Sequence, residues 1–361
     1  MEFLEAFHLY DEVAPIKYET KDTSRGDNDY RVHIFAEWQN KKIVIKITDN
    51  DFTTVERVQC WAKTIEAYIS AGYYCPRILK NVNGDYAASI SLNGRTCCVY
   101  AEEFSKYKTA EAFSKSDITA NGSYIFLDDV LKSIGVIGAK HLKTADFPFG
   151  CCILEKFAPS DPCDEIMQES LNFKKVVEKS LPKYKERFDK IWSAFLENKR
   201  KLEEVYPLLP TSVFQGDLNH TNILLDDNGN FVGLLDFNLC GRDTIVNQLF
   251  IEIMMECDCC GYEVFYSKEA NEKTIKRFLS KIRMVADIYD FSEMEINAAI
   301  LVYRYLKTFW WRPAHEIDNV KDDEQKVRQI FDWVENELTR TDIDFAGVMR
   351  KNELFDSLDE T

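Results

Sequence analysis

The sequence VFQGDLNHTNILL, residues 213–225, is followed after a short polar turn by GLLDFN, residues 233–238. The apolar runs predict three short strands, and a polar loop joins the first strand to the second. An Asn-Gly pair at residues 228–229 lies between two apolar runs and predicts a hairpin. This hairpin is expected to bring Asp236, at the end of the third strand, back beside Asn222.

Three polar side chains of this stretch form a set that suits phosphoryl transfer. The carboxylate of Asp217 can orient an attacking hydroxyl group and accept its proton. The amide oxygen of Asn222 and the carboxylate of Asp236 can hold magnesium against the phosphates of a nucleotide. The alternative is a polar hairpin without chemistry, because Asp, Asn and Gly are common in turns. Two fixed spacings, each in its own strand context, favour the site.

The pattern G-D-x-x-x-x-N-I-L at residues 216–224, followed by a D-F-N motif that begins at Asp236, resembles the catalytic core of a known family. This is the aminoglycoside phosphotransferase and choline kinase family, which is related to the protein kinases. The resemblance implies that Asp217 is the catalytic base and that Asn222 and Asp236 are magnesium ligands. The family usually has His before the Gly-Asp pair, where this chain has Gln215.

The resemblance also implies a fold of the α+β class, a two-lobed protein-kinase-like structure. A small lobe over residues 1–104 is expected to be an antiparallel sheet with one helix that covers the nucleotide. A larger, mostly helical lobe over residues 105–361 is expected to carry the catalytic loop and the acceptor site. Alternation of apolar and polar residues independently predicts strands at residues 16–20, 30–38 and 42–48.

Lys46 stands inside the apolar strand segment 43–47. A charge in such a place needs a partner, because burial of an unpaired charge is costly. The resemblance implies that nucleotide phosphates and a helix Glu are those partners. Helical spacing over residues 54–71 supplies Glu66 and Glu56, of which we prefer Glu66 because its separation from Lys46 is closer to that in kinase-like folds. A solvent-exposed Lys on an edge strand is the alternative.

The polar loop at residues 23–29 joins the first two strands of this lobe. In kinase-like folds such a loop lies over the phosphates, so Ser24, Arg25 and the backbone amides are candidates to hold phosphate oxygens. An ordinary hairpin loop is the alternative. By its order in the chain, Glu103 marks the segment whose backbone is expected to read the nucleobase. ATP is the expected co-substrate, and GTP stays open because backbone contacts leave no side-chain signature.

The 361-residue chain has a formal net charge of −16. With 45% hydrophobic residues, its composition is that of an ordinary globular protein large enough for two lobes. Nucleic acid is not an expected partner, because no basic surplus exists to neutralise its phosphates. The negative charge favours a cationic small-molecule acceptor, since acids around a pocket concentrate amines. Acidity that serves solubility alone is the alternative explanation.

No apolar run approaches the length of a membrane span, and the start MEFLE lacks the basic region and apolar core of a signal peptide. We therefore expect no membrane association and a cytoplasmic location. The 11 cysteines, several of them adjacent in sequence, suit a reducing compartment. The CDCC run at residues 257–260 lacks the paired spacing of a structural zinc site and is interpreted as packing or incidental thiols.

Taken with the resemblance, these features predict transfer of a phosphate from ATP, with Mg²⁺, to a hydroxyl group of a small molecule. Aminoglycosides, amino-alcohols and sugars all stay open as acceptors. An aromatic cluster at Tyr303, Tyr305, Trp310 and Trp311 can cage a cationic ligand, but helix packing is the favoured interpretation. One rival function is a protein kinase, although Asp236 is followed almost at once by a predicted helix rather than an activation segment. The other is a nucleotide-binding pseudokinase with a regulatory role.

Overall fold

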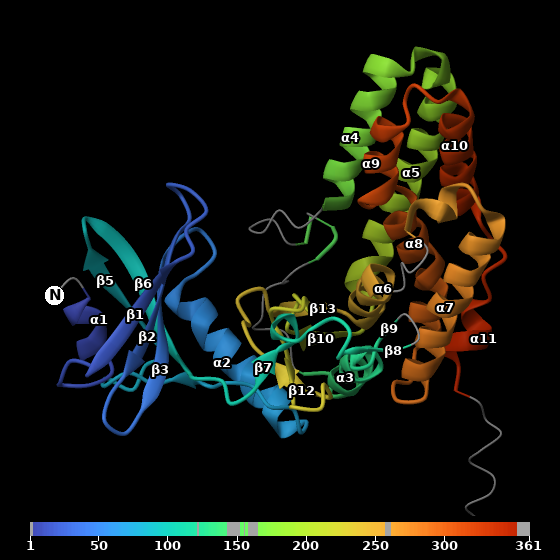
Figure 1. Ribbon diagram of the computed structural model, residues 1–361. Coiled ribbons are helices and arrows are strands. Elements are labelled where there is room, and N and C mark those ends of the chain that lie inside the picture. The colour runs from blue at the N-terminus through green and yellow to red at the C-terminus, as the bar shows by residue number, and fades with distance from the viewer. Residues whose placement is uncertain are drawn as a thin grey trace, which may run out of the picture. The chain divides into compact units, whose positions relative to one another are not determined.

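The computed structural model describes residues 3–120, 123–142, 152–154, 156–157, 165–256 and 261–351 (Figure 1). Its packing forms two compact units, of which the first comprises residues 3–119 and 213–241 among those described. The remaining described residues make up the second unit. The predicted catalytic stretch, residues 213–238, is therefore grouped with the N-terminal sheet, whereas we expected a boundary between lobes near residue 105. That boundary stays a prediction.

A six-stranded antiparallel sheet forms most of the first unit (Figure 1). The strand order is β1-β2-β3-β6-β4, and β5 pairs with β6. The three strands predicted from alternation are confirmed as β1, β2 and β3. The bounds are β1 Lys17–Asp22, β2 Tyr30–Glu37, β3 Lys42–Asp49, β4 Ile78–Leu79, β5 Ala87–Leu92 and β6 Arg95–Glu103.

The two faces of this sheet differ in chemistry because side chains alternate along each strand. Ile34, Ile45 and Val99 are fully buried on one face, where they form a core with Phe7 of the short helix α1 (Leu4–His8). The opposite face carries the side chain of Lys46, which lines a pocket. The apolar alternation therefore fixes which face of the sheet is available to a ligand.

Helix α2 (Val55–Ser70) is the helix that the sequence predicts for this region. It begins after Thr54, whose side-chain oxygen accepts a hydrogen bond from the Arg57 backbone N–H at 3.3 Å. Its Trp61 ring packs edge-on against the Tyr100 ring of β6, with 5.6 Å between the ring centroids. These contacts attach the helix to the same unit as the sheet.

The predicted hairpin is confirmed as β11 (Ile223–Leu225) and β12 (Phe231–Leu234), and β11 also pairs with β7 (Lys108–Thr109). Ile223 is opposite Leu234, and the Leu235 N–H donates to the Asn222 carbonyl at 2.9 Å, so the chain delivers Asp236 next to Asn222. Gly233 lies against the Tyr74 backbone, and a Cβ atom there would come within 1.7 Å of the Tyr74 carbonyl oxygen. Only glycine fits this close approach.

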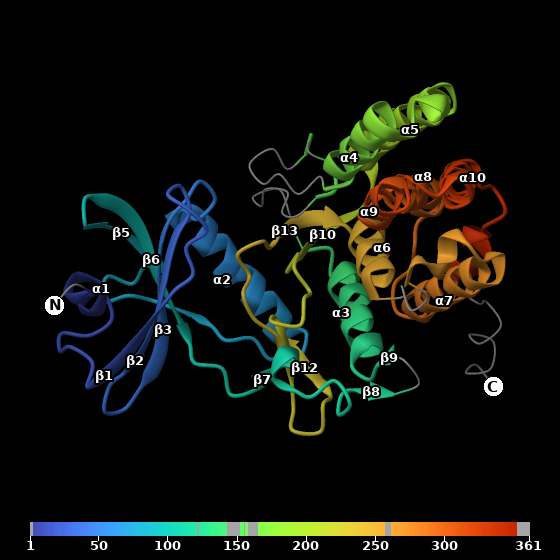
Figure 2. The ribbon, with the colours of Figure 1, turned by 45° about the horizontal axis from the view of Figure 1, so that its top comes forward.

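The second unit is mostly helical, and Figure 2 shows α4 beside α5 and α8 beside α10. Its core is rich in stacked aromatic rings, such as those of Phe195 and Tyr305, whose centroids are 5.3 Å apart. Pro182 separates α4 from α5, because proline is disfavoured in the interior of a helix. The helices are α3 Leu127–Ala139, α4 Glu165–Ser180, α5 Lys185–Val205, α6 Ile245–Glu256, α7 Lys268–Ala286, α8 Glu293–Phe309, α9 Arg312–Asn319, α10 Glu324–Thr339 and α11 Phe345–Met349.

Four further strands are short. They are β8 Thr119–Ala120, β9 Ser123–Tyr124, β10 Thr211–Phe214 and β13 Gly241–Thr244. The sequence predicts β10 as the strand that leads into the catalytic loop, and the structure confirms it. Within the described part of the chain, no helix combines the length and the apolar character needed to cross a bilayer.

Candidate active site

A pocket of about 660 Å³ lies within the first unit. Its lining includes Lys46 and Glu102 from the sheet, and Asn222 and Asp236 from the catalytic stretch. The volume is in the range of small-molecule and cofactor sites in proteins. The predicted phosphate-binding lysine and both predicted metal ligands are thus gathered around one space.

Lys46 is buried, with 6% of its surface exposed, and it has two acidic partners. Its Nζ atom lies 3.0 Å from Glu102 Oε1 and 3.3 Å from Asp236 Oδ1. Burial opposes the charge, but the carboxylates of Asp236 and Glu102 outweigh it and raise the pKa of Lys46 well above its usual value. The ammonium group is therefore held charged beside the predicted metal ligand.

The pairing of Lys46 with Glu66 that we expected is wrong. Glu66 is exposed on α2 and instead binds Arg77, with 2.8 Å between Oε1 and the arginine Nε. Glu56, the other helix candidate, is exposed as well. The partner is Glu102, because the register of β3 and β6 places its side chain on the same face of the sheet as Lys46, whereas Glu66 faces Arg77.

The predicted metal ligands present oxygen atoms to the pocket. Asn222 is buried, and its Nδ2 donates to the backbone oxygen and to Oδ2 of Asp217, both at 3.0 Å, so its Oδ1 points away from that residue. Asp236 has a backbone φ of 56°, an unusual value for a residue other than glycine. Such strain is characteristic of functional sites.

Asn238 adds a third oxygen that the sequence interpretation missed. Its Oδ1 is buried and has no hydrogen-bond partner among the described residues, and the residue lines the pocket. A buried acceptor without a donor is costly unless a ligand satisfies it. Together with Asn222 and Asp236, it forms a set of hard oxygen donors that fits Mg²⁺.

Asp217, the predicted catalytic base, is held by two amides. Asn219 Nδ2 donates to its Oδ1 at 2.7 Å, and Asn222 Nδ2 donates to its Oδ2. Burial, followed by repulsion from Asp236, raises the pKa of Asp217, although the two amide hydrogen bonds oppose the increase. Asp217 does not itself line the pocket among the described residues, but Asn222 connects it to the lining.

Gln215 occupies the position where the family usually has His. Its side chain is fully buried, and Nε2 donates to the backbone oxygens of Leu235 at 3.1 Å and of Asp236 at 2.8 Å. Its Oε1 accepts the Asp217 backbone N–H at 2.6 Å. Its own backbone N–H donates to the Tyr68 hydroxyl at 3.1 Å. The side chain therefore connects the predicted catalytic loop to the segment that carries Asp236.

The loop at residues 23–29 supplies Arg25 to the pocket, as expected, but not Ser24. The Ser24 hydroxyl accepts the Arg31 backbone N–H at 3.0 Å and so closes the hairpin instead of facing a ligand. Arg31 and His33 do line the pocket, and the sequence interpretation missed both. The sequence pattern could have identified them, because Arg31 and His33 alternate along the strand at residues 30–38 with apolar side chains that face the core, and so face the opposite side.

Glu103 lines the pocket, but its backbone N–H is already used. It donates to the Arg77 carbonyl at 2.9 Å, and the Glu103 side chain accepts the Arg77 N–H at 3.1 Å. Contact between a nucleobase and the backbone near Glu103 stays a prediction. The amide of Glu103 itself is not available for it in this structure.

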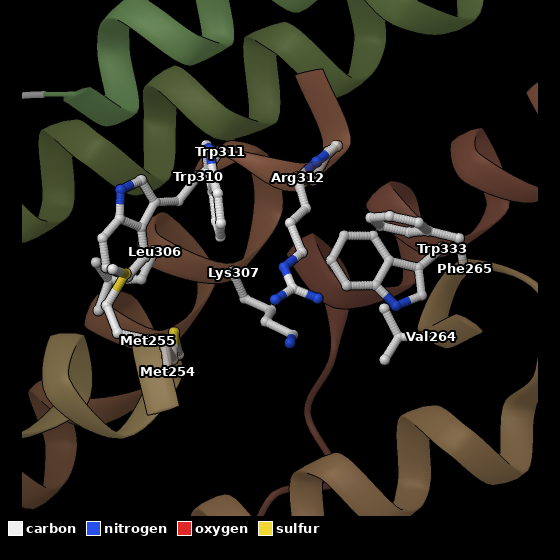
Figure 3. Close-up of a pocket in the computed structure, with 11 residues that line it drawn as sticks. Met254, Met255, Val264, Phe265, Leu306, Lys307, Trp310, Trp311, Arg312 and Trp333 are labelled. Atoms are coloured by element: carbon white, nitrogen blue, oxygen red, sulfur yellow. The ribbon is translucent and has the colours of Figure 1, made fainter. Parts of the chain in front are cut away.

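The second unit contains a separate small pocket lined by Trp310 and Trp311 (Figure 3). The basic side chains of Lys307 and Arg312 extend into the same space (Figure 3). Two positive charges in the lining disfavour a cage for a cationic ligand. Tyr303 and Tyr305, the other two members of the expected aromatic cluster, are buried in the core, in agreement with the favoured packing interpretation. The run at residues 257–260 lies outside the described residues.

Comparisons with known proteins agree with this geometry. A sequence model of the phosphotransferase enzyme family APH matches residues 162–251, which include the catalytic stretch. This match confirms the resemblance predicted from the motifs. Among curated proteins, no sequence matches the chain significantly.

Several solved structures are similar to the chain. That of a microcompartment-associated aminopropanol kinase has a TM-score of 0.50 and 9% identity, over 92% of this chain and 94% of that chain. An amicoumacin kinase in complex with AMP-PNP, Ca²⁺ and Ami has a TM-score of 0.46 and 13% identity, over 95% of each chain. A choline kinase from Cryptosporidium parvum has a TM-score of 0.39 and 16% identity, over 90% of each chain. The first of these similarities confirms the kinase-like α+β fold.

Proposed function

We propose that the protein transfers the γ-phosphate of a nucleoside triphosphate to a hydroxyl group of a small molecule. One observation carries the proposal: Lys46 is paired with Asp236, Asn222 donates to Asp217, and Lys46, Asn222 and Asp236 line a single pocket. A structural hairpin has no need of a buried lysine between two carboxylates or of an orphaned amide oxygen at Asn238. Phosphoryl transfer uses a lysine for the phosphates, an aspartate as base, and aspartate and asparagine oxygens for the metal.

In the proposed reaction, Asp217 orients the acceptor hydroxyl and accepts its proton late, because the transition state is loose and demands little base strength. The hydrogen bonds from Asn219 and Asn222 fix the direction of its carboxylate. Burial raises the pKa of Asp217, which brings the carboxylate closer to the strength that suits a general base. The hydrogen bonds and the raised pKa thus both concern the carboxylate oxygens of Asp217.

Lys46 is proposed to hold the α- and β-phosphates. In the structure its charge is shared between Glu102 and Asp236. Asn222, Asp236 and Asn238 would hold Mg²⁺, which neutralises the charge of the phosphates when bound. With Mg²⁺ bound, Asp236 would hold the cation, and Lys46, still paired with Glu102, would be available to contact the phosphates.

The proposed acceptor is a small molecule with a hydroxyl group, such as an aminoglycoside, an amino-alcohol or a sugar. The net charge of −16 favours a cationic acceptor. A protein acceptor is disfavoured, because α6 begins at Ile245, only a few residues after Asp236, and leaves no room for an activation segment. A pseudokinase is disfavoured because the lysine, both aspartates and Asn222 are all present, with Lys46 paired to Asp236 and Asn222 bound to Asp217.

The test is magnesium-dependent release of ADP by the purified protein with a panel of aminoglycosides, choline, ethanolamine, homoserine and simple sugars. Nucleotide binding is measured in parallel by calorimetry. The Asp217→Asn protein is the negative control, and Asp227→Asn, an exposed Asp in the β11–β12 turn, is the matched control. Acceptor-dependent release that is lost only in Asp217→Asn supports the proposal. Absence of nucleotide binding in the presence of magnesium would overturn it in favour of a different function for the fold.

A further inference from the structure

Glu102 stands next to the most apolar part of the pocket. On the pocket face, Phe35 of β2 is opposite Val44 of β3, and Val44 is opposite Glu102 of β6. We call Phe35 and Val44 the apolar row. The neighbouring row, two residues along β3, contains Lys46. Side chains directly opposite on one face are within contact distance, so Glu102 borders the apolar row on one side and Lys46 on the other.

The pocket therefore has two chemically different ends. The ring of Phe104 lies 6.5 Å from that of Phe35 and extends the apolar row. In the opposite direction, beyond Lys46, the lining includes Arg25 and also Arg31, whose guanidinium is already paired with Asp29 at 2.6 Å. A nucleotide is amphipathic in the same sense, with a flat base and anionic phosphates. The base is thus expected over the apolar row and the phosphates at the end that carries Lys46 and Arg25.

The two carboxylate oxygens of Glu102 have different surroundings. Oε1 accepts a hydrogen bond from Lys46 Nζ at 3.0 Å. Oε2 receives no hydrogen bond from any residue in the part of the chain that the structure describes. The side chain is only 14% exposed, and the residue lines the pocket. Because an ionised carboxylate can only accept hydrogen bonds, a ligand that enters here must supply a donor to Oε2.

We infer that Glu102 selects adenine nucleotides over guanine nucleotides, an inference that rests on the proposed function. Adenine offers a single exocyclic amino group, which matches the single open oxygen. Guanine carries a carbonyl oxygen at the corresponding ring position, and this oxygen would be repelled. Guanine donates hydrogen bonds from its N1–H and its neighbouring 2-amino group, and a carboxylate accepts both only with its two oxygens. In Glu102 one of these oxygens already accepts from Lys46. ATP is therefore the phosphate donor that fits this pocket.

The experiment compares the affinities of ADP and GDP, each with magnesium, for the wild-type protein by calorimetry. We expect ADP to bind at least about tenfold more tightly, because an unmatched hydrogen-bonding group at a charged partner costs at least that factor. The Glu102→Gln variant should lose most of this ratio, because its amide can donate to the guanine oxygen. The ratio of ADP affinity to GDP affinity reports on recognition of the base alone, because a displaced Lys46 would lower the affinities of both nucleotides equally.

Glu37→Gln is the matched control, because this exposed Glu at the end of β2 does not line the pocket. It should keep the wild-type ratio. A second measurement needs no variant: purine riboside diphosphate, which lacks the amino group, should bind the wild-type protein about tenfold more weakly than ADP. A wild-type ADP-to-GDP ratio near one, a preference for GDP, or equal binding of the purine analogue would overturn the inference and leave the proposed function standing. Absence of binding by both ADP and GDP would overturn the proposed function itself.

Discussion

Gln215 donates a hydrogen bond from its side-chain Nε2 to the backbone oxygen of Asp236 at 2.8 Å. The other end of the same amide accepts the Asp217 backbone N–H. One buried side chain thus sets the distance between the proposed base and the proposed metal ligand. The donor and the acceptor of a single amide are both required, which explains how Gln serves at a position where the family usually has His.

The Gln215→Glu change should lower activity and stability together. It keeps an acceptor for the Asp217 N–H but replaces the donor with an oxygen that faces two backbone carbonyl oxygens. The loss of a buried hydrogen bond and the new repulsion should cost about 1–3 kcal/mol of unfolding free energy. Urea denaturation and the magnesium concentration for half-maximal activity measure both effects. The exposed Gln39→Glu change is the control for added charge, and equal stability of the two variants would contradict the role of Gln215.

Asp217→Asn should leave nucleotide binding nearly intact while removing transfer. The amide keeps the shape of the side chain but cannot accept the proton of the acceptor. We expect kcat to fall at least about 100-fold, the usual contribution of a positioned general base. Calorimetry with ADP and magnesium checks that the affinity changes by less than about threefold, since Asp217 is not among the pocket-lining residues described. Retained turnover would remove Asp217 from the mechanism.

Asp236→Asn, unlike Asp217→Asn, should weaken the binding of the nucleotide with magnesium. Its carboxylate is a proposed magnesium ligand, so the affinity for ADP in the presence of magnesium should fall at least about tenfold. In the absence of magnesium the affinity should change little or rise, because Lys46 loses one of its competing acidic partners. Titrations with and without EDTA separate the two conditions. An equal effect in both would show that Asp236 acts through the fold and not through a metal.

The hairpin, and the placement of Asn222 near Asp236 that it brings about, were predictable from the sequence because they are local. Asn222 and Asp236 are joined by a tight turn and by a register that the apolar pattern sets. The partner of Lys46 was not predictable in this way. Glu102 lies 56 residues away in the sequence. Its side chain reaches Lys46 because β3 and β6 are neighbours in the sheet although they are far apart in the sequence. In the sequence, Glu66 was the stronger candidate because its separation from Lys46 is similar to that in kinase-like folds. In the structure its partner is Arg77.

Glu66→Gln should accordingly leave nucleotide affinity unchanged. The ion pair between Glu66 and Arg77 is exposed, with side-chain exposures of 53% and 48%, and such pairs contribute less than about 1 kcal/mol to stability. Lys46→Met should instead weaken ADP binding at least about tenfold, because the proposed phosphate contact is lost. Fluorescence titration of a labelled nucleotide compares the two variants. A loss of affinity in Glu66→Gln would restore the helix Glu to the site.

Gly233→Ala tests the close approach that places Asp236. The new Cβ would overlap the Tyr74 carbonyl oxygen, which is backbone and cannot rotate away. The Leu234 N–H also donates to this oxygen at 3.0 Å, so relief of the overlap disrupts the bond. We expect a loss of more than about 3 kcal/mol of unfolding free energy. Asp227→Ala, an exposed change in the same hairpin, should cost less than about 0.5 kcal/mol, and similar midpoints in urea would refute the steric argument.

His33 should make the stability of the protein depend on pH. Burial, followed by repulsion from Lys46, lowers the pKa of His33 from 6.5 to about 4. The unfolded chain therefore binds a proton more readily than the folded chain between these two values. Stability should be fully retained above pH 6.5 and should fall as the pH drops toward 4. Between pH 7 and pH 5 the contribution of His33 to this loss is about 2 kcal/mol.

His33→Gln should remove that component, and the exposed His8→Gln change should not. Urea denaturation at the two pH values measures the difference for each variant. Because every other titrating group is shared, subtraction of the wild-type change isolates His33. The sign is the sharp part of the prediction: relative to His33→Gln, the wild type must lose stability on acidification. A wild type that gains stability relative to the variant would show that His33 is protonated in the folded protein, and that the pocket holds an acid close enough to outweigh Lys46.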